Sequence, residues 1–169
     1  MRDKVTNVVF AGLGGQGVLK ASDILADAAF RCQLDVKKSE IHGMSQRGGS
    51  VASDVRFGKE VFSPMVPPGE ADFLVILEET QTEVARPILK PEGVLLTPDL
   101  VPKEALSNPK ALNVALAGAL SVFLEIPEQV WLDAVRANLP EKHHAVNLAA
   151  FEAGRAAGRN MATASKPGD

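Results

Sequence analysis

Four glycines and a glutamine near the N-terminus form a turn whose chemistry suits phosphate binding. Residues 12–17, hereafter the glycine turn, read Gly-Leu-Gly-Gly-Gln-Gly and satisfy the glycine fingerprint of dinucleotide-binding folds. Glycines permit a tight turn and a close approach of backbone to ligand, and a following helix offers free N–H groups and partial positive charge to a phosphate. Alternatively, the glycines serve only to pack that helix on a sheet. The candidate binding residues are Gly12, Gly14, Gly15, Gln16 and Gly17.

A second segment, residues 42–50, combines hydrogen-bond donors with a pair of glycines. This segment, hereafter the arginine loop, reads His-Gly-Met-Ser-Gln-Arg-Gly-Gly-Ser. A glycine pair behind an arginine exposes several backbone N–H groups, and the planar guanidinium of Arg47 suits a carboxylate or a phosphate. The alternative is a tight structural loop in which Gly48 and Gly49 adopt positive φ and Arg47 pairs with an internal carboxylate. The candidate residues are His42, Gly43, Ser45, Gln46, Arg47, Gly48, Gly49 and Ser50.

The other reactive side chains form no recognisable catalytic or metal-binding pattern. Glu40 stands near the position where dinucleotide-binding folds place an acid for the ribose hydroxyls, but two lysines precede it. His42 is a candidate base with no visible nucleophile in a strand–turn–helix elbow. His143 and His144 point about 100° apart on a helix, so they do not chelate one metal. We therefore expect no catalytic residue and no metal ligand on this chain.

The glycine turn needs a strand before it and a helix after it, and the sequence predicts both. Residues 5–11 are β-branched and mostly apolar, which is typical of a strand buried on both faces. Residues 18–29 repeat apolar side chains at helical spacing, with acidic residues on the other face. A short strand at 34–38 would lie beside the first one. Because ligands of open α/β folds bind at the C-terminal edge of the sheet, we expect the two loops to meet there.

The remaining pattern predicts a three-layer αβα, Rossmann-like fold with a mostly parallel sheet, a β-hairpin and a helical C-terminal third. Residues 39–49 lack a usable period and are expected to form an ordered loop. We expect one domain over residues 1–160 and a flexible tail at 161–169. Further strands are predicted at 51–57, 61–62 (the hairpin partner), 71–77 and 94–97, and helices from Glu78 to Pro91 and at 110–124, 128–138 and 143–158.

Composition excludes several classes of function. The 169 residues are 46% hydrophobic and 23% charged, as in an ordinary globular domain. A net charge of −3, with seven Phe, one Trp and no Tyr, argues against nucleic acid as a partner. The single cysteine, Cys32, excludes an intramolecular disulfide and a thiolate-bound cluster built from this chain alone. With no recognisable signal peptide or bilayer-spanning segment, we expect a cytoplasmic protein without a membrane partner.

Together, the glycine turn and residues 41–51 resemble the gamma subunit of 2-oxoacid:ferredoxin oxidoreductases. That family includes the pyruvate, 2-oxoglutarate and branched-chain enzymes and the small subunit of indolepyruvate oxidoreductase. The likeness spans nearly the whole chain, although the stretch between Gly93 and Ala111 is shorter than in many relatives, which have another strand and helix there. Supporting matches are Arg56-Phe57-Gly58, Phe62-Ser63-Pro64, Gly69-Glu70-Ala71-Asp72, Leu77-Glu78, Lys90-Pro91-Glu92-Gly93, Asn113-Val114-Ala115, Gly118-Ala119-Leu120 and Asn147-Leu148-Ala149-Ala150-Phe151-Glu152-Ala153-Gly154.

The resemblance implies a subunit of a complex that decarboxylates a 2-oxoacid onto coenzyme A and passes electrons to ferredoxin. In that family, thiamine diphosphate and magnesium belong to the alpha and beta parts, and iron–sulfur clusters to the beta and ferredoxin-like parts. The gamma subunit is then non-catalytic and inactive alone. Its two loops either hold coenzyme A or dock against the catalytic subunits, and in isolation a homodimer is one way to cover its interface. The alternative is a stand-alone domain that binds a nucleotide or coenzyme A.

Overall fold

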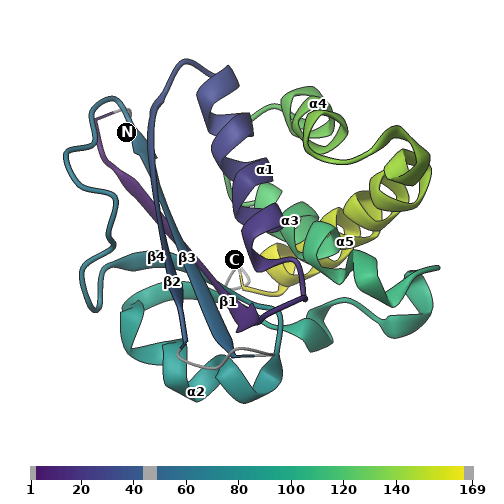
Figure 1. Cartoon of the computed structure of the whole chain (residues 1–169), viewed down its shortest axis with the longest axis horizontal. Coiled ribbons are helices and arrows are strands. Elements are labelled where there is room, and N and C mark those ends of the chain that lie inside the picture. Colours follow the sequence, from purple (N-terminus) through teal and green to yellow (C-terminus); the bar gives the residue numbers. More distant parts are fainter. Residues whose placement is uncertain (1–2, 44–48, 166–169) are drawn as a thin grey trace.

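The computed structural model describes residues 3–43 and 49–165, and in them a five-stranded sheet has helices on both faces (Figure 1). The strands are β1 (Thr6–Leu13), β2 (Asp35–His42), β3 (Ser50–Gly58), β4 (Ala71–Ile76) and β5 (Leu89–Leu96). The α-helices are α1 (Val18–Arg31), α2 (Thr82–Ala85), α3 (Leu112–Ser121), α4 (Glu128–Asn138) and α5 (His144–Ala164). Single 3₁₀ turns are η1 (Glu79–Gln81), η2 (Arg86–Ile88), η3 (Pro98–Leu100), η4 (Lys103–Ala105), η5 (Pro109–Ala111) and η6 (Glu141–His143).

The strand order is β2-β3-β1-β4-β5, with β1 at the centre. β1 pairs in parallel with β4, and β4 pairs in parallel with β5. β3 is antiparallel to both β1 and β2. Four strands therefore run in one direction and β3 runs in the other. The prediction of a mostly parallel sheet holds for strand direction, but only two of the four pairings in the described part are parallel.

The hairpin lies elsewhere than predicted. β2 and β3 pair along their whole length, from Asp35 opposite Gly58 to His42 opposite Val51, so the hairpin loop is residues 43–49. The strand predicted at 34–38 extends to His42 and does not lie beside β1, because β3 separates the two. Nor is the segment 61–62 a strand, since the backbone N–H of Val61 donates to the Asp35 side chain, 2.8 Å away, instead of joining a ladder.

Proline and long-range pairing also move the later boundaries. The helix predicted from Glu78 breaks into η1, the four-residue α2 and η2, because Pro87 cannot supply the N–H that a continuous helix needs. β5 begins at Leu89 instead of residue 94, since its pairing with β4 recruits the earlier residues. The helix predicted at 110–124 is η5 followed by the shorter α3. α5 continues to Ala164, beyond the predicted end at 158.

The two faces of the sheet are covered unequally, as Figure 1 shows. On the helix face, α1, α3, α4 and α5 pack over a large core that includes Val8, Phe10 and Trp131. On the other face, hereafter the outer face, Val9 and Ala11 contribute to a smaller core under Val66, η2 and the end of α2. The predicted three-layer fold is present, with a second helical layer reduced to α2 and its flanking turns. None of the helices in the described ranges is long and apolar enough to span a membrane.

Candidate functional site

The two loops singled out from the sequence meet at one edge of the sheet. The N–H of Gly14 donates to the carbonyl oxygen of Gly49 at 2.9 Å. Directly below this bond, Leu13 at the end of β1 lies opposite Ser50 at the start of β3. Because β1, β2 and β4 run in the same direction, this is the edge formed by their carboxyl ends, where open α/β sheets bind ligands.

Two glycines of the turn adopt a backbone conformation that other residues rarely adopt. Gly15 has φ +86° and Gly17 has φ +82°. A Cβ atom placed on Gly15 would meet nothing within 4 Å, whereas one placed on Gly17 would lie 2.4 Å from Nδ2 of the buried Asn113. Gly17 is therefore required by packing as well as by conformation. The backbone of Gly15 is open on the side where a side chain would otherwise stand.

Gln16 holds the turn together from inside. Its Oε1 accepts a hydrogen bond from the N–H of Leu13 at 2.7 Å, and its Nε2 donates to Oε2 of Glu78 at 2.7 Å. Gly12 leaves room for this arrangement, because a Cβ there would come within 2.9 Å of Gln16 Oε1. Gln16 is thus a positioning residue in this structure. Glu78 was missed as a site residue, although its place immediately after a buried strand was a usable signal.

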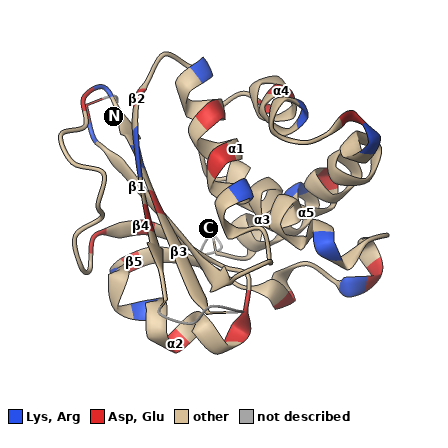
Figure 2. Ribbon diagram, viewed as in Figure 1, with Lys and Arg blue, Asp and Glu red and all other residues tan. Residues whose placement is uncertain are grey.

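A cavity of about 340 Å³ opens beside the turn. α1 begins here without a side-chain cap and without an acidic residue in its first turn, so the N–H groups of residues 18–20 have no partner inside the helix. Figure 2 shows that α1 has basic residues at both ends and acidic residues between them. An exposed lysine, Lys110, adds a cation from the start of α3. The cavity is lined by Gly15, Gln16, Gly17, Leu77, Pro109, Lys110 and Leu112.

This arrangement can bind an anion. A helix N-terminus places partial positive charge and several N–H donors at one point, and a lysine rim supplies a full charge. The volume is at the lower end of the range for ligand pockets, so the cavity suits one phosphate-bearing part of a larger ligand. Lys110 was not predicted, because nothing local in the sequence connects it with a turn almost a hundred residues earlier.

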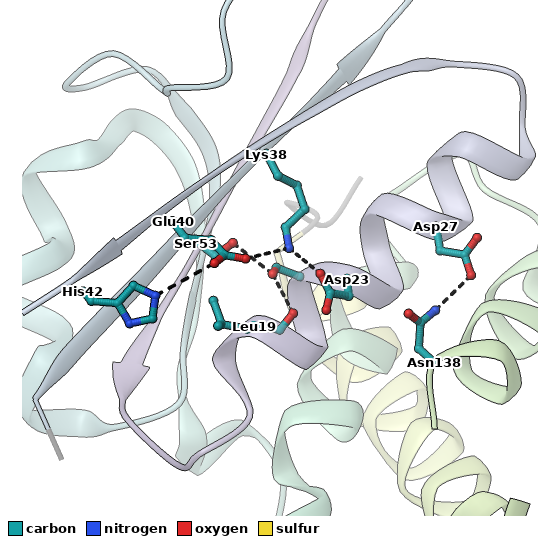
Figure 3. Close-up of polar contacts among 9 residues, drawn as sticks. Leu19, Asp23, Asp27, Lys38, Glu40, His42, Ser53 and Asn138 are labelled. Atoms are coloured by element: carbon teal, nitrogen blue, oxygen red, sulfur yellow. Dashed lines mark hydrogen bonds and ion pairs between the residues drawn. The ribbon is translucent and has the colours of Figure 1, made fainter. Parts of the chain in front are cut away.

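His42 lies at the end of a chain of ion pairs on the helix face of β2 (Figure 3). Its Nε2 is 3.9 Å from Oε2 of Glu40, whose other oxygen is 3.3 Å from Nζ of Lys38. Lys38 also pairs with Asp23 of α1. The side chain of His42 is 57% exposed, so the imidazole is accessible from solvent.

Glu40 does not occupy the ribose position of a dinucleotide-binding fold. That position requires the second strand to lie beside the first, but β3 separates β2 from β1. The carboxylate of Glu40 is also occupied by Lys38 and His42. Its side chain therefore anchors β2 to α1, and the sheet order gives no support for a dehydrogenase that binds NAD in the usual way.

Only the two ends of the arginine loop can be placed. The N–H of Gly43 donates to the carbonyl oxygen of Ser50 at 2.6 Å, and a Cβ on Gly43 would lie 2.8 Å from Ser50 Oγ. Gly49, as described above, accepts from Gly14, so these residues close the loop with backbone bonds. Four of the predicted site residues lie outside the described ranges, namely Ser45, Gln46, Arg47 and Gly48.

A second depression lies at the opposite end of the sheet. It has a volume of about 1000 Å³ and is formed between the end of α1, the start of β4 and the α3–α4 connection. Cys32 lies on its wall, and burial raises the pKa of its thiol. Among residues 3–43 and 49–165, no three His, Cys, Asp or Glu side chains are grouped closely enough to hold a metal ion.

Comparison with known proteins gives a consistent picture. The family described as "Pyruvate ferredoxin/flavodoxin oxidoreductase" matches residues 7–157. Indolepyruvate oxidoreductase subunit IorB of Thermococcus kodakarensis is 32% identical over 198 aligned positions, which cover 94% of this chain and 98% of that protein.

Two solved structures share the fold. The gamma subunit of a keto/oxoacid ferredoxin oxidoreductase from Geobacter sulfurreducens superposes with a TM-score of 0.76 at 20% identity, covering 93% of this chain and 98% of the other. The 2-oxoglutarate:ferredoxin oxidoreductase of Magnetococcus marinus, solved with 2-oxoglutarate, coenzyme A and succinyl-CoA bound, gives a TM-score of 0.79 at 22% identity. There the match covers 94% of this chain but 32% of the longer chain.

Proposed function

The chain belongs to the pyruvate ferredoxin/flavodoxin oxidoreductase family, and from that premise we propose that it holds the phosphate-bearing end of coenzyme A for an oxidoreductase complex. It is the small, gamma-type subunit of a 2-oxoacid:ferredoxin oxidoreductase, a complex that converts a 2-oxoacid to an acyl-CoA. One observation carries the coenzyme A proposal: the open backbone of Gly15, the uncapped start of α1 and Lys110 converge on one cavity.

The redox chemistry then belongs to partner chains. A single cysteine cannot ligate an iron–sulfur cluster, and the described residues offer no group of ligands for a magnesium–diphosphate site. We therefore assign thiamine diphosphate and magnesium to the alpha and beta subunits, and the clusters to the beta and ferredoxin-like subunits. Ferredoxin would receive its electrons through those subunits, in a complex that we place in the cytoplasm.

The contribution of this chain is positional. N–H groups at the start of α1 and at Gly15 would donate to phosphate oxygens, while the ammonium of Lys110 would balance their charge. Gln16 fixes the shape of the turn through its bonds to Leu13 and Glu78. Holding one end of coenzyme A raises the effective concentration of its thiol at the neighbouring catalytic subunit, where the acyl group is transferred.

The remaining alternative is a stand-alone domain that binds a nucleotide or coenzyme A. It is not favoured, because the similar proteins are subunits of oxidoreductase complexes. The two readings differ in what the protein brings with it. Purification of the native protein without thiamine- and cluster-bearing partners would count against the subunit role.

Ligand binding is tested by calorimetric titration of the isolated chain with coenzyme A and, separately, with NAD. We expect heat with coenzyme A, and about tenfold weaker binding after Lys110→Ala, because one charge-assisted hydrogen bond is lost. Lys59→Ala is the matched control, since Lys59 is equally exposed and lies at the other end of β3. The proposal fails if coenzyme A gives no heat, or if the two lysine variants bind it equally well.

A further inference from the structure

Residues 59–70, hereafter the outer loop, cross the outer face of the sheet between β3 and β4 and contain no helix or strand. Figure 1 shows this segment on the side of the sheet opposite α1, α3, α4 and α5. Such a segment is usually the most adaptable part of a domain. Here, however, side chains of three strands hold its backbone in place.

Polar side chains of β2 and β3 make the first contacts with the outer loop. The carboxylate of Asp35 accepts a hydrogen bond from the N–H of Val61 at 2.8 Å. The carboxylate of Asp54 accepts one from the N–H of Val66, also at 2.8 Å. Because Asp54 is only 5% exposed, burial raises its pKa, so this contact is made although desolvation opposes the charge.

Arg56 and Asn7 complete the attachment. The Arg56 guanidinium donates to the carbonyl oxygens of Ser63 at 2.8 Å and Met65 at 3.3 Å, and its Nε donates to Asn7 Oδ1 at 2.9 Å. Asn7 Nδ2 in turn donates to the carbonyl oxygen of Glu70 at 3.0 Å. The outer loop is thus fixed at five points along its length.

The rigid loop presents apolar side chains to solvent. Val61 and Val66 are buried, at 2% and 4% exposure, whereas Phe62 and Met65 are 84% and 53% exposed. Ile41, which points to the outer face from β2, is 51% exposed. A buried polar network that fixes an exposed Phe and Met does not stabilise the isolated chain through those two side chains. It does lower the entropic cost of binding them to something else.

We propose that Phe62 and Met65 are preformed anchors that dock into an apolar pocket of the thiamine-binding subunit of the same complex. This inference rests on the proposed function. The nine residues from 61 to 69 carry no charge, so the complementary pocket is apolar and needs no counter-ion. The glycine turn stays free, because it lies at the sheet edge and the anchors lie on the outer face.

A second copy of this chain is the weaker candidate for the occupant. In a symmetric dimer the same patch meets itself, so Phe62 would oppose another projecting side chain. Neither cavity described above is lined by Phe62 or Met65, so the patch offers no hole for its own knob. If the anchor of one copy entered a cavity elsewhere on the next, the contact would be heterologous and would give open-ended chains.

The test uses the full chain carrying an affinity tag, expressed together with its native partner genes. The chain is purified, and the thiamine diphosphate retained per mole of chain is measured by thiochrome fluorescence. We expect Phe62→Ser to retain at least about tenfold less than wild type, because a buried aromatic anchor dominates an interface. Phe30→Ser is the matched control, since Phe30 is 71% exposed on α1, on the other side of the sheet, and should leave retention unchanged.

The outcomes separate this inference from the proposed function. If wild type retains no thiamine-binding subunit, the proposed function fails and the docking site fails with it. If wild type and Phe62→Ser retain it equally, only the docking site is overturned. Light scattering of the isolated chain supplies the last check: a dimer that Phe62→Ser converts to monomer would overturn the thiamine-binding subunit as the occupant.

Discussion

Replacing Gly15 by alanine separates the ligand-binding role of the glycine turn from its folding role. Gly15 and Gly69 both have positive φ, +86° and +76°, and a Cβ on either would meet nothing within 4 Å. The strain of an L-residue in this conformation is therefore the same at both positions. Only Gly15 lines the cavity beside α1, so Gly69→Ala is a matched control for conformational cost.

The expected magnitudes follow from these environments. A left-handed alanine costs about 1–2 kcal/mol, partly offset by about 0.4–1 kcal/mol from the restricted unfolded chain. Both variants should thus lose about 1 kcal/mol, or about 2–4 °C in Tm for a chain of this length. In addition, the methyl group of Gly15→Ala would displace a phosphate from the backbone. Losing one charge-assisted hydrogen bond costs about 2 kcal/mol, which is about 30-fold in Kd.

Urea unfolding measures the first quantity, and calorimetric titration with coenzyme A measures the second. The reasoning requires equal stability losses and a weakened affinity in Gly15→Ala alone. Equal affinities of Gly15→Ala and Gly69→Ala for coenzyme A would refute the close approach of ligand to the turn.

Three further substitutions test parts of the account by urea unfolding. Because the pKa of Asp54 is raised by burial, its protonated form stabilises the fold, and this contribution is lost as pH rises through the folded-state pKa; the stability of Asp54→Asn relative to wild type should therefore increase from about pH 4 to pH 7, and a constant difference would contradict this. Gly154→Ala would place a Cβ 1.6 Å from the carbonyl oxygen of Ala115 and should cost about 2 kcal/mol or more despite the higher helix propensity of alanine; an unchanged midpoint would show that α3 and α5 separate freely. Gln16→Leu leaves the N–H of Leu13 without its acceptor and should cost about 1–3 kcal/mol, whereas wild-type stability would mean that water replaces the amide.

Local signals in the sequence predicted the part of the fold that contains the candidate site. The buried strand β1, the glycine turn and α1 were each visible, because glycine spacing and apolar periodicity are properties of neighbouring residues. The meeting of the two loops at one edge also followed from strand direction, and the bond between Gly14 and Gly49 brings them together. The breaks at Pro127 and Pro140 bound α4 as predicted.

Features that depend on distant pairing were not visible. The place of β3 between β1 and β2 is decided by competition among strands, so the hairpin partner at 61–62 was predicted wrongly. Lys110 and Glu78 come to the glycine turn from distant elements, and no local motif marks either one. The attachment of the outer loop depends in the same way on Asp54 and Arg56, which read in the sequence only as the wetter face of a strand.

The central claim, that this subunit holds coenzyme A while its partners perform the chemistry, is tested most directly by steady-state kinetics of the assembled complex. The complex should be rebuilt with Gly15→Ala in this chain, and the KM values for coenzyme A and for the 2-oxoacid should be measured separately. The account predicts that KM for coenzyme A rises at least about tenfold, while kcat and the KM for the 2-oxoacid stay at wild-type values. An unchanged KM for coenzyme A, or a loss confined to kcat or to the 2-oxoacid, would contradict it.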